Sequence, residues 1–361
     1  MKSKPVRVLL LSRYDRLGAS SRVRAYQYIP FLSENGVEVT PAPLLDSQYL
    51  QRRYSGQSRD VAAIAATYLR RLFELMRAGR RFDLLWVEKE IFPWLPGLLE
   101  QVLTSRIPYV VDYDDALFHQ YDLHPNPVTR WLLGRKIDEV MRRAVVVMTG
   151  NEYLASHART AGARKVEIVP TVIDLDRYDP SPLAHQGLVI GWIGSPATAA
   201  YLQLVRKPAL HAHRTHGARV VTVGSGNVEL GDVPVEVHPW SEASEVDEIR
   251  RFDVGIMPLP DEPWERGKCG YKLVQYMSAG KPVIGSPVGV NRDLIQPGVN
   301  GLFATTDEEW TDALDRVLRS PAEAARMGQR GRELVERRYC TKVTGPHLLR
   351  ILREAAARKG C

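Results

Sequence analysis

Residues 266–289 read RGKCGYKLVQYMSAGKPVIGSPVG, and this stretch decides the fold class. A helical pattern over 271–278 ends in the small residues Ser278, Ala279 and Gly280, and a short apolar strand follows at 282–284. A turn with a glycine at each end, 285–289, comes after that strand. A helix, a tight turn and a buried strand in this order are typical of a layered α/β fold.

The same alternation continues on both sides of this stretch. Apolar runs such as Val6–Leu11 and Arg219–Val223 alternate with segments of helical periodicity, including 22–35, 128–143 and 198–213, each expected to be one helix. Parallel neighbouring strands need connections of that length, so the sequence predicts doubly wound parallel sheets.

The domain boundary is predicted at 174–187 (DLDRYDPSPLAHQG), which contains two prolines and has no periodicity. The first domain is then 1–173 and the second 188–341, with a C-terminal helix at about 342–361 packing back on the first. After Leu302 the chain is expected to be helical to its end. In such sheets ligands bind where strands end and loops turn into helices, so functional residues are expected there.

Composition excludes several classes of protein. The three cysteines, Cys269, Cys340 and Cys361, lie far apart, so neither a disulfide framework nor a zinc site is predicted and a cytoplasmic setting fits best. The apolar run 8–11 is too short for a signal peptide, and no stretch approaches the length of a membrane span. We therefore expect a soluble or at most peripheral protein.

The net charge of +7 is concentrated between Arg52 and Arg81, where eight arginines accompany only Asp60 and Glu74. The apolar stripe of this segment is typical of an amphipathic helix packed on a sheet; it comprises Ile64, Tyr68, Leu72, Leu75 and Met76. The arginine excess leaves open a lipid-phosphate acceptor or an anionic membrane surface, such as the inner face of the cell membrane. No nucleic-acid motif is present, so nucleic acid is not an expected partner.

The loop after the first strand is one candidate ligand site. Gly18, Ser20 and Ser21 lead into a helix whose first turns carry Arg22 and Arg24. Small residues let backbone N–H groups approach a ligand, and a helix N-terminus favours anions. The alternative is an ordinary loop in which Ser20 or Ser21 caps the helix.

A related loop opens the second domain. Gly194 and Ser195 follow a strand there, and Thr198 is expected to cap the next helix. Simple turn chemistry is the alternative to ligand binding.

Two lysines in the opening stretch give the most specific signal. Lys268 and Lys272 are four residues apart, so their ammonium groups can reach one point, where they repel each other unless an anion lies between them. A pyrophosphate would supply that charge. Gln275 and Tyr276 follow Lys272 at helical spacing and are expected on the same face. A solvated charged face is the alternative.

The segment KLVQYMSAGKPVIGSPVGVNRDLI at 272–295, followed by GVNGLF at 298–303, resembles the donor-site segment of the retaining family 4 glycosyltransferases. The run IVPTVIDLDRY at 168–178 is similar to the family's crossing from strand to linker. Weaker similarity covers nearly the whole chain. The resemblance implies the GT-B fold, in which two Rossmann-like domains face a central cleft.

This resemblance also implies an activity. The family transfers a sugar from a nucleotide diphosphate sugar to a glycan, lipid-linked or small-molecule acceptor, without metal or other cofactor, and the departing phosphate helps to deprotonate the acceptor. A non-catalytic nucleotide-sugar-binding relative, or a partner subunit, is the alternative. The implied donor-binding residues are Gly194, Ser195, Thr198, Gly224, Trp240, Lys268, Gly270, Lys272, Gln275 and Tyr276.

The chain departs from the family pattern at two positions. Most members have glutamates where Gly267 and Gln275 stand. Gln275 can still accept hydrogen bonds from ribose hydroxyls through its carbonyl oxygen. Lys268 and Lys272 are then the residues expected to hold the diphosphate.

An acidic cluster supplies the implied residues of the first domain. Asp114 and Asp115 follow a predicted strand, with His119 close behind, and Asp114 or Asp115 is expected to orient sugar or acceptor hydroxyls as a catalytic residue together with Lys272. A metal site of two carboxylates or local loop capping are the alternatives. Glu88, in the triplet Glu88-Lys89-Glu90 after another strand, lines the acceptor side or belongs to a surface salt-bridge cluster.

Overall fold

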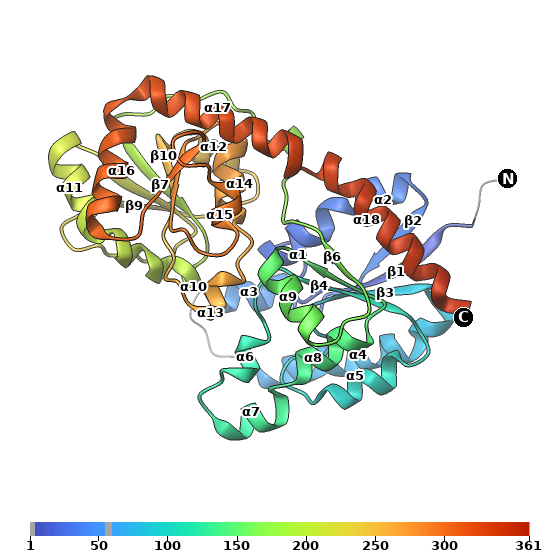
Figure 1. Cartoon of the computed structure of the whole chain (residues 1–361). Coiled ribbons are helices and arrows are strands. Elements are labelled where there is room, and N and C mark those ends of the chain that lie inside the picture. The colour runs from blue at the N-terminus through green and yellow to red at the C-terminus, as the bar shows by residue number, and fades with distance from the viewer. Residues whose placement is uncertain (1–3, 55–59, 361) are drawn as a thin grey trace. The chain divides into compact units, whose positions relative to one another are not determined.

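The computed structural model describes residues 4–54 and 60–360, and the chain divides into two compact units. The first unit comprises 1–171 and 341–361, and the second comprises 172–340. Each unit contains one parallel six-stranded sheet flanked by helices (Figure 1), so the predicted α/β class with doubly wound sheets is confirmed. Residues 174–187, predicted as a linker, lie in the second unit, where η2 (Leu175–Arg177) forms.

The sheet of the first unit has the order β2-β1-β3-β4-β5-β6, and all its pairs are parallel. All carboxyl ends therefore lie at one edge, where Glu88 and Asp112 are opposite each other in register. The strands are β1 (Val6–Leu11), β2 (Val37–Pro41), β3 (Leu84–Glu88), β4 (Tyr109–Tyr113), β5 (Val146–Thr149) and β6 (Val166–Ile168).

The direction in which the chain moves from strand to strand decides which face of the sheet each helix covers. Right-handed crossovers from β2 to β3 and onward to β6 put α4, α5, α8 and α9 on one face, and each packs on the next in that order. The C-terminal helix α18 packs on α2 and on β3 and β4 (Figure 1). The helices are α1 (Ala19–Arg24), η1 (Tyr26–Tyr28), α2 (Ile29–Glu34), α3 (Ser47–Tyr54), α4 (Val61–Arg81), α5 (Gly97–Thr104), α6 (His119–Asp122), α7 (Pro127–Leu133), α8 (Lys136–Arg143), α9 (Glu152–Thr160), α18 (Thr341–Ala356) and η4 (Ala357–Gly360).

The sheet of the second unit has the order β12-β11-β10-β7-β8-β9 and is also parallel. The strands are β7 (Val189–Ile193), β8 (Arg219–Val223), β9 (Val235–His238), β10 (Val254–Met257), β11 (Val283–Gly285) and β12 (Gly301–Phe303). The helices are α10 (Pro196–Ala199), η3 (Ala200–Val205), α11 (Arg206–His216), α12 (Glu245–Arg250), α13 (Pro263–Arg266), α14 (Tyr271–Ser278), α15 (Asn291–Leu294), α16 (Asp307–Arg319) and α17 (Pro321–Arg338).

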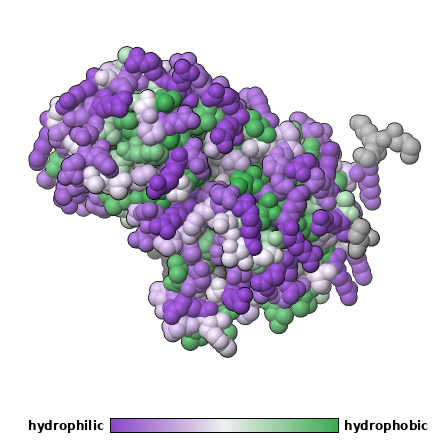
Figure 2. Space-filling view, viewed as in Figure 1, coloured by the Kyte–Doolittle hydropathy of each residue, from purple (hydrophilic) through white to green (hydrophobic). Residues whose placement is uncertain are grey.

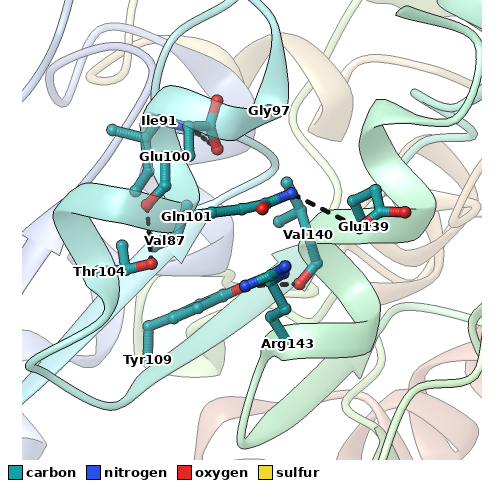
Figure 3. Close-up of a pocket in the computed structure, with 10 residues that line it drawn as sticks. All are labelled: Val87, Ile91, Gly97, Glu100, Gln101, Thr104, Tyr109, Glu139, Val140 and Arg143. Atoms are coloured by element: carbon teal, nitrogen blue, oxygen red, sulfur yellow. Dashed lines mark hydrogen bonds between the residues drawn. The ribbon is translucent and has the colours of Figure 1, made fainter.

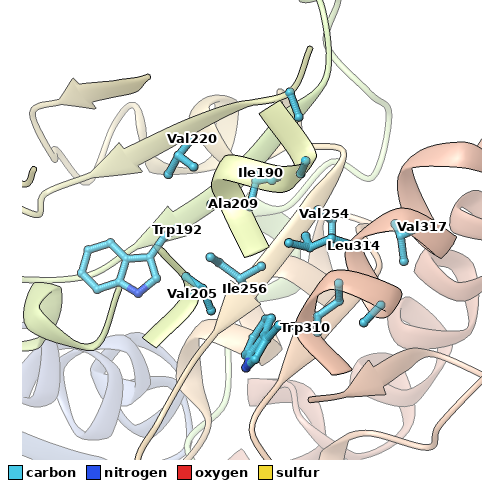
Figure 4. Packing of buried hydrophobic residues seen from close by; sticks show 14 of the residues in the cluster. Ile190, Trp192, Val205, Ala209, Val220, Val254, Ile256, Trp310, Leu314 and Val317 are labelled. Atoms are coloured by element: carbon cyan, nitrogen blue, oxygen red, sulfur yellow. The ribbon is translucent and has the colours of Figure 1, made fainter. Parts of the chain in front are cut away.

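An apolar core fixes the frame of this unit. Ile190, Val254 and Ile256 from the strands pack with Val205 and Trp310 from the helices beside the sheet, as Figure 4 shows. A close-packed interior has low compressibility, so this core holds the strand ends in a rigid frame.

Three expected helices are interrupted. The segment 128–143 forms α7 and α8 because Arg135, after the weak helix former Gly134, leaves the helical region at φ −105° and ψ 8°. The segment 22–35 is split into α1, η1 and α2; Pro30 has no N–H to donate inside a helix. The segment 198–213 is divided among α10, η3 and α11. The prediction that the chain is helical after Leu302 is confirmed by α16, α17, α18 and η4; strand β12, which pairs with β11, ends at Phe303.

The basic helix α4 differs from its prediction in two side chains. Arg71 is buried and donates to the carbonyls of Ser12, at 2.8 Å, and of Ala42; burial lowers its pKa to about 10. Met76, expected in the packed stripe, is 66% exposed. Arg53 and Arg59 lie outside the part of the chain whose side chains are described. Among the described residues, no helix combines the length and apolarity needed to cross a membrane.

Candidate functional site

Two turns, one after β7 and one after β8, meet at the carboxyl edge of the second sheet. The N–H of Gly194, after β7, donates to the backbone carbonyl of Val223 at 3.0 Å. The N–H of Gly224, after β8, donates to the backbone carbonyl of His238 at 2.9 Å. Gly224 has φ +77°, and a Cβ there would lie 2.5 Å from the carbonyl oxygen of Gly194 and 2.9 Å from the Cβ of Trp240. Only glycine fits, because the turns approach each other so closely.

Lys272 brings a positive charge to these turns. It lies in α14, which begins after Gly270 in the left-handed region at φ +65°. A Cβ on Gly194 would lie 2.8 Å from the Cε of Lys272, and the Lys272 ammonium lies 5.2 Å from the ring centroid of Trp192. A half-buried cation beside closely packed backbone turns is suited to binding an anion.

Lys268 lies in the turn that precedes α14. Its ammonium is 6.0 Å from the ring centroid of Trp264. The two lysines that the sequence singled out therefore rest on different tryptophans, Lys268 on Trp264 and Lys272 on Trp192.

The capping role predicted for Thr198 is wrong. Thr198 lies inside the single turn α10, and the N-cap is Ser195, whose side chain caps no N–H. The backbone N–H and hydroxyl of Thr198 both donate to the carbonyl of Ser195, at 3.0 and 3.2 Å. Pro196 at the first helical position starts the helix one turn earlier than expected.

A direct donor contact by Tyr276 is also wrong. Tyr276 is fully buried; its hydroxyl accepts from the N–H of Ile193 at 3.0 Å and donates to the carbonyl of Ile256 at 3.3 Å. A Cβ added to Gly255 would lie only 2.3 Å from the Tyr276 ring, so the ring packs directly against the glycine backbone. Because α14 packs on the sheet, the residue one turn after Lys272 points into the core and fixes β7 against β10.

Gln275 is joined to a buried carboxylate that the sequence did not reveal. Its amide donates to the hydroxyl of Tyr178 at 3.2 Å, and that hydroxyl donates to Glu245 at 3.3 Å. The indole N–H of Trp240 donates to the second oxygen of Glu245 at 3.0 Å. Nothing in the sequence distinguishes Glu245, which is fully buried, from the acidic residues around it.

The acidic cluster of the first unit is organised around Lys89. The ammonium of Lys89 lies 2.9 Å from Asp114 Oδ1 and 3.4 Å from Asp115 Oδ2, and the Ser20 hydroxyl donates to Asp114 Oδ2 at 2.5 Å. The Asp115 side chain is 28% exposed, against 13% for Asp114. The sequence offered Lys89 only as the middle of the triplet after β3.

Electrostatics keep Lys89 and Asp114 ionised. Burial opposes charge on Lys89, but the carboxylates of Asp114 and Asp115 outweigh it and raise the pKa of Lys89 above its usual value. Burial likewise opposes charge on Asp114, yet Lys89, Arg24 and the Ser20 hydroxyl lower its pKa to about 2. At neutral pH the Asp114 carboxylate can therefore accept hydrogen bonds but cannot donate a proton.

The backbone at Lys89 is strained. Lys89 has φ +66° and Trp94 has φ +65°, values that residues other than glycine rarely adopt. The segment between them is held by the Glu100 carboxylate, which accepts from the N–H groups of Ile91 and Phe92 at 3.2 and 3.0 Å. Such strain persists where surrounding contacts impose it, and it is concentrated at functional sites.

Glu88 ties the first loop to the sheet. It is 3% exposed, so the alternative of a surface salt bridge is wrong. Its Oε2 accepts from the Ser21 hydroxyl at 2.6 Å and the Arg13 N–H at 2.9 Å. Burial raises the pKa of Glu88, although Lys89 opposes this. The N-cap of α1 is Gly18, so capping by Ser20 or Ser21 is wrong as well.

The phosphate contacts predicted for Arg22 and Arg24 are wrong. Arg24 is buried and makes a two-pronged ion pair with Asp112, at 2.8 and 2.5 Å. Arg22 is buried as well and donates to the carbonyls of Arg16, at 3.4 Å, and Leu17, at 3.5 Å. Arg24 thus joins the loop to the end of β4, and Arg22 joins two carbonyl groups within the loop.

His119 is oriented at the start of α6. Its Nδ1 lies 2.9 Å from Asp122 Oδ1, and its Nε2 lies 2.8 Å from the Tyr153 hydroxyl. Within the described ranges, no group of three or more histidine, cysteine, aspartate and glutamate side chains is arranged to hold a metal ion.

A narrow pocket lies elsewhere in the first unit, between α5 and α8. Figure 3 shows hydrogen bonds that cross it from Gln101 to Glu139, at 3.5 Å, and from Tyr109 to the carbonyl of Val140, at 2.7 Å. None of the residues predicted from the sequence lines it. The lining residues are Val87, Ile91, Gly97, Glu100, Gln101, Thr104, Tyr109, Glu139, Val140 and Arg143.

Two family descriptions match the chain in succession. "Glycosyl transferase 4-like domain" matches residues 5–171, and "Glycosyl transferases group 1" matches 187–320. The chain belongs to the family 4 glycosyltransferases. This confirms the resemblance on which the predicted donor site rests.

Relatives in sequence agree. The chain is 24% identical over 182 residues to the putative teichuronic acid biosynthesis glycosyltransferase TuaH of Bacillus subtilis, covering 44% of this chain and 45% of TuaH. It is 29% identical over 268 residues to the D-inositol 3-phosphate glycosyltransferase of Saccharomonospora viridis, covering 64% of this chain and 60% of that one. The chain thus spans about half to three-fifths of the length of these relatives.

Solved structures of the GT-B family share the fold. The sucrose-phosphate synthase of Thermosynechococcus elongatus superposes with a TM-score of 0.72 at 14% identity, over 98% of this chain and all of the other. Anabaena Alr3699/HepE in complex with UDP-glucose gives 0.70 at 13% identity, over 96% and 99%. The predicted GT-B fold is thereby confirmed.

Proposed function

We propose that this family 4 glycosyltransferase moves a sugar from a nucleoside diphosphate to an acceptor hydroxyl, with retention of anomeric configuration and without a metal ion. The observation that carries the proposal is Lys272, whose side chain lies against the Gly194 turn at the ends of the parallel strands. Related proteins support it, since HepE was solved with UDP-glucose and TuaH is named for a polysaccharide pathway.

The second unit is proposed to bind the donor. Backbone N–H groups at the Gly194 and Gly224 turns, with the ammonium of Lys272, would bind the diphosphate. Lys268, at the turn before α14, would supply a second positive charge. Gln275 and Trp240, fixed through Tyr178 and Glu245, would border the nucleoside.

The first unit is proposed to bind a glycan, lipid-linked or small-molecule acceptor. Asp115 is the more exposed of the two carboxyl groups and would accept a hydrogen bond from an acceptor hydroxyl, with Lys89 holding it in place. A divalent ion would have to displace the Lys89 ammonium, which already forms ion pairs with both side chains. This arrangement favours the metal-free interpretation over a site of two carboxylates.

The proposed step needs no side-chain nucleophile. The acceptor oxygen forms a bond to the anomeric carbon on the face from which the diphosphate departs. The bond from that carbon to the phosphate oxygen breaks, its electron pair goes to this oxygen, and the acceptor proton follows to the phosphate. Lys272 stabilises the charge that develops there.

Incubation with UDP-, GDP- and ADP-sugars, with and without a chelator, tests the reaction. We expect release of one nucleoside diphosphate at a rate that the chelator does not change, and NMR of a transferred sugar should show the donor's anomeric configuration. Strict magnesium or manganese dependence contradicts the metal-free proposal. Nucleotide binding without turnover in the presence of oligosaccharide and lipid-phosphate acceptors favours the non-catalytic alternative.

Lys272→Ala tests the site itself. A hydrogen bond to a charged group is worth about 1.5–3 kcal/mol, so the affinity for the nucleoside diphosphate should fall about 10- to 150-fold in calorimetry. Lys207→Ala is the matched control, because Lys207 lies in the same unit, is 83% exposed and pairs with Asp307. Equal affinities of the two variants refute the role of Lys272.

A further inference from the structure

One helical face of the first unit exposes large apolar side chains. They include Trp131 on α7 at 83%, Leu98 on α5 at 68% and Met76 on α4 at 66%. Neighbours at helical spacing extend each of them into a stripe: Leu69 and Phe73 on α4, Val102 on α5, and Val128 and Leu132 on α7. Scattered apolar residues are normal on a surface, but continuous stripes mark interaction sites.

The three helices belong to one surface. The right-handed crossovers put α4, α5 and α8 on the same face of the sheet, and α4 contacts α5, α5 contacts α8, and α8 contacts α7. Apolar atoms appear in green along the lower edge of the first unit in Figure 2, where Figure 1 places α7 and α5. We call this surface the α4–α5–α7 face.

The exposed charges of this surface are mostly positive. Between residues 61 and 143 every aspartate and glutamate is buried or half-buried, and the most accessible are Glu74, Asp122 and Glu139, whose side chains are 33%, 35% and 34% exposed. The exposed arginines of the same range are Arg70, Arg77, Arg80, Arg81, Arg106, Arg130, Arg135 and Arg143. Apolar stripes with an excess of exposed arginines complement a surface that is negative outside and apolar beneath.

We propose that the α4–α5–α7 face binds the surface of a membrane that contains anionic lipids. Trp131, Leu98 and Met76 enter the headgroup region, while the arginines contact lipid phosphates. A second copy of this chain is a poorer occupant, since it would set one cationic surface against another. The inference rests on the exposed face alone and does not depend on the transferase activity.

Vesicle flotation with the full chain tests the proposal. We expect binding to vesicles of phosphatidylcholine with about one-third phosphatidylglycerol and little binding to phosphatidylcholine alone. Salt at about 1 M shortens the Debye length to about 3 Å and should release the protein. Insertion of Trp131 should shift the tryptophan emission to shorter wavelength, and Trp131→Ser should remove that shift.

Charge variants give the magnitude. An arginine near an anionic membrane contributes about fivefold to binding, so Arg77→Gln with Arg80→Gln should weaken it by about 25-fold. Arg319→Gln with Arg330→Gln is the matched control, because these exposed arginines of the second unit are outside the face. Circular dichroism verifies that all variants are folded.

Three results would overturn the proposal. One is equal binding to neutral and anionic vesicles, and another is equal weakening by the control pair. The third is a dimer in sedimentation equilibrium that Trp131→Ser dissociates, which would assign the face to a second copy. Lys272→Ala should bind vesicles like the unaltered chain, so failure of the transferase proposal leaves this test intact.

Discussion

Replacing Lys89 by methionine should destabilise the first unit in a way that depends on pH. The variant keeps most of the side-chain volume but removes the ammonium that lies 2.9 Å from Asp114 and 3.4 Å from Asp115. Two carboxylates then remain close together at the end of β4 without the cation between them. The loss comes from uncompensated charge and not from an empty space.

The magnitude follows from Asp114. Its pKa is about 2 in the folded protein against an ordinary 3.8, and this difference corresponds to about 2 kcal/mol of unfolding free energy. Because the folded pKa is depressed, that stabilisation is complete above the ordinary pKa and is lost as pH falls towards 2. Breaking a buried pair by removing one partner costs about 3–5 kcal/mol, which sets the upper end for Lys89→Met at pH 7.

Urea unfolding between pH 7 and pH 3 measures this effect, with Lys207→Met as the control in the second unit. The difference between the Lys89→Met variant and the unaltered chain should shrink as the medium is acidified, since Asp114 of the variant protonates more readily. A Lys89→Met variant as stable as the unaltered chain at pH 7 would refute the reasoning.

Two further substitutions separate positioning from binding. Gly194→Ala should displace Lys272 and the Trp192 ring, because the new Cβ would lie 2.8 Å from Lys272 Cε and 2.5 Å from that ring. Nucleotide affinity measured by calorimetry should then fall by about tenfold or more. Unchanged affinity argues against the turn as a binding site. Arg24→Met should lower the unfolding free energy by about 3–5 kcal/mol, whereas Arg24→Met with Asp112→Leu should recover most of the loss in urea titrations; a double variant as unstable as the single one contradicts the pair as the cause.

The fold was open to prediction because its signals are local. Strand β1 has the bounds 6–11 that the apolar run indicated, and α14 has those of its helical pattern, 271–278. Alternating polarity within a few residues reports burial without knowledge of distant segments. Helix interruptions such as that at Gly134 were missed, since packing and not periodicity decides where a helix breaks.

Residue roles were less accessible to sequence reasoning. The sequence singled out the loop after β1 as a ligand site, but it did not show that Arg24 pairs with Asp112 and Ser21 with Glu88, partners far away along the chain. Tyr276 lies on the predicted helix but points into the core. A side chain's partner depends on which strand ends become neighbours, and local patterning carries no information on that.

By itself the sequence determined the α/β layering, the parallel strands and the two turns with glycine and lysine on either side of α14. These features follow from side-chain polarity and backbone freedom at nearby positions. Only the tertiary structure decided which charges face a ligand and which hold the protein together. Arg71 and Lys89 are both buried cations, but Arg71 lies against carbonyl oxygens and Lys89 lies beside carboxylates. The physical reason is that burying a charge requires an opposite charge or dipole, and the folded chain supplies these from segments remote in sequence.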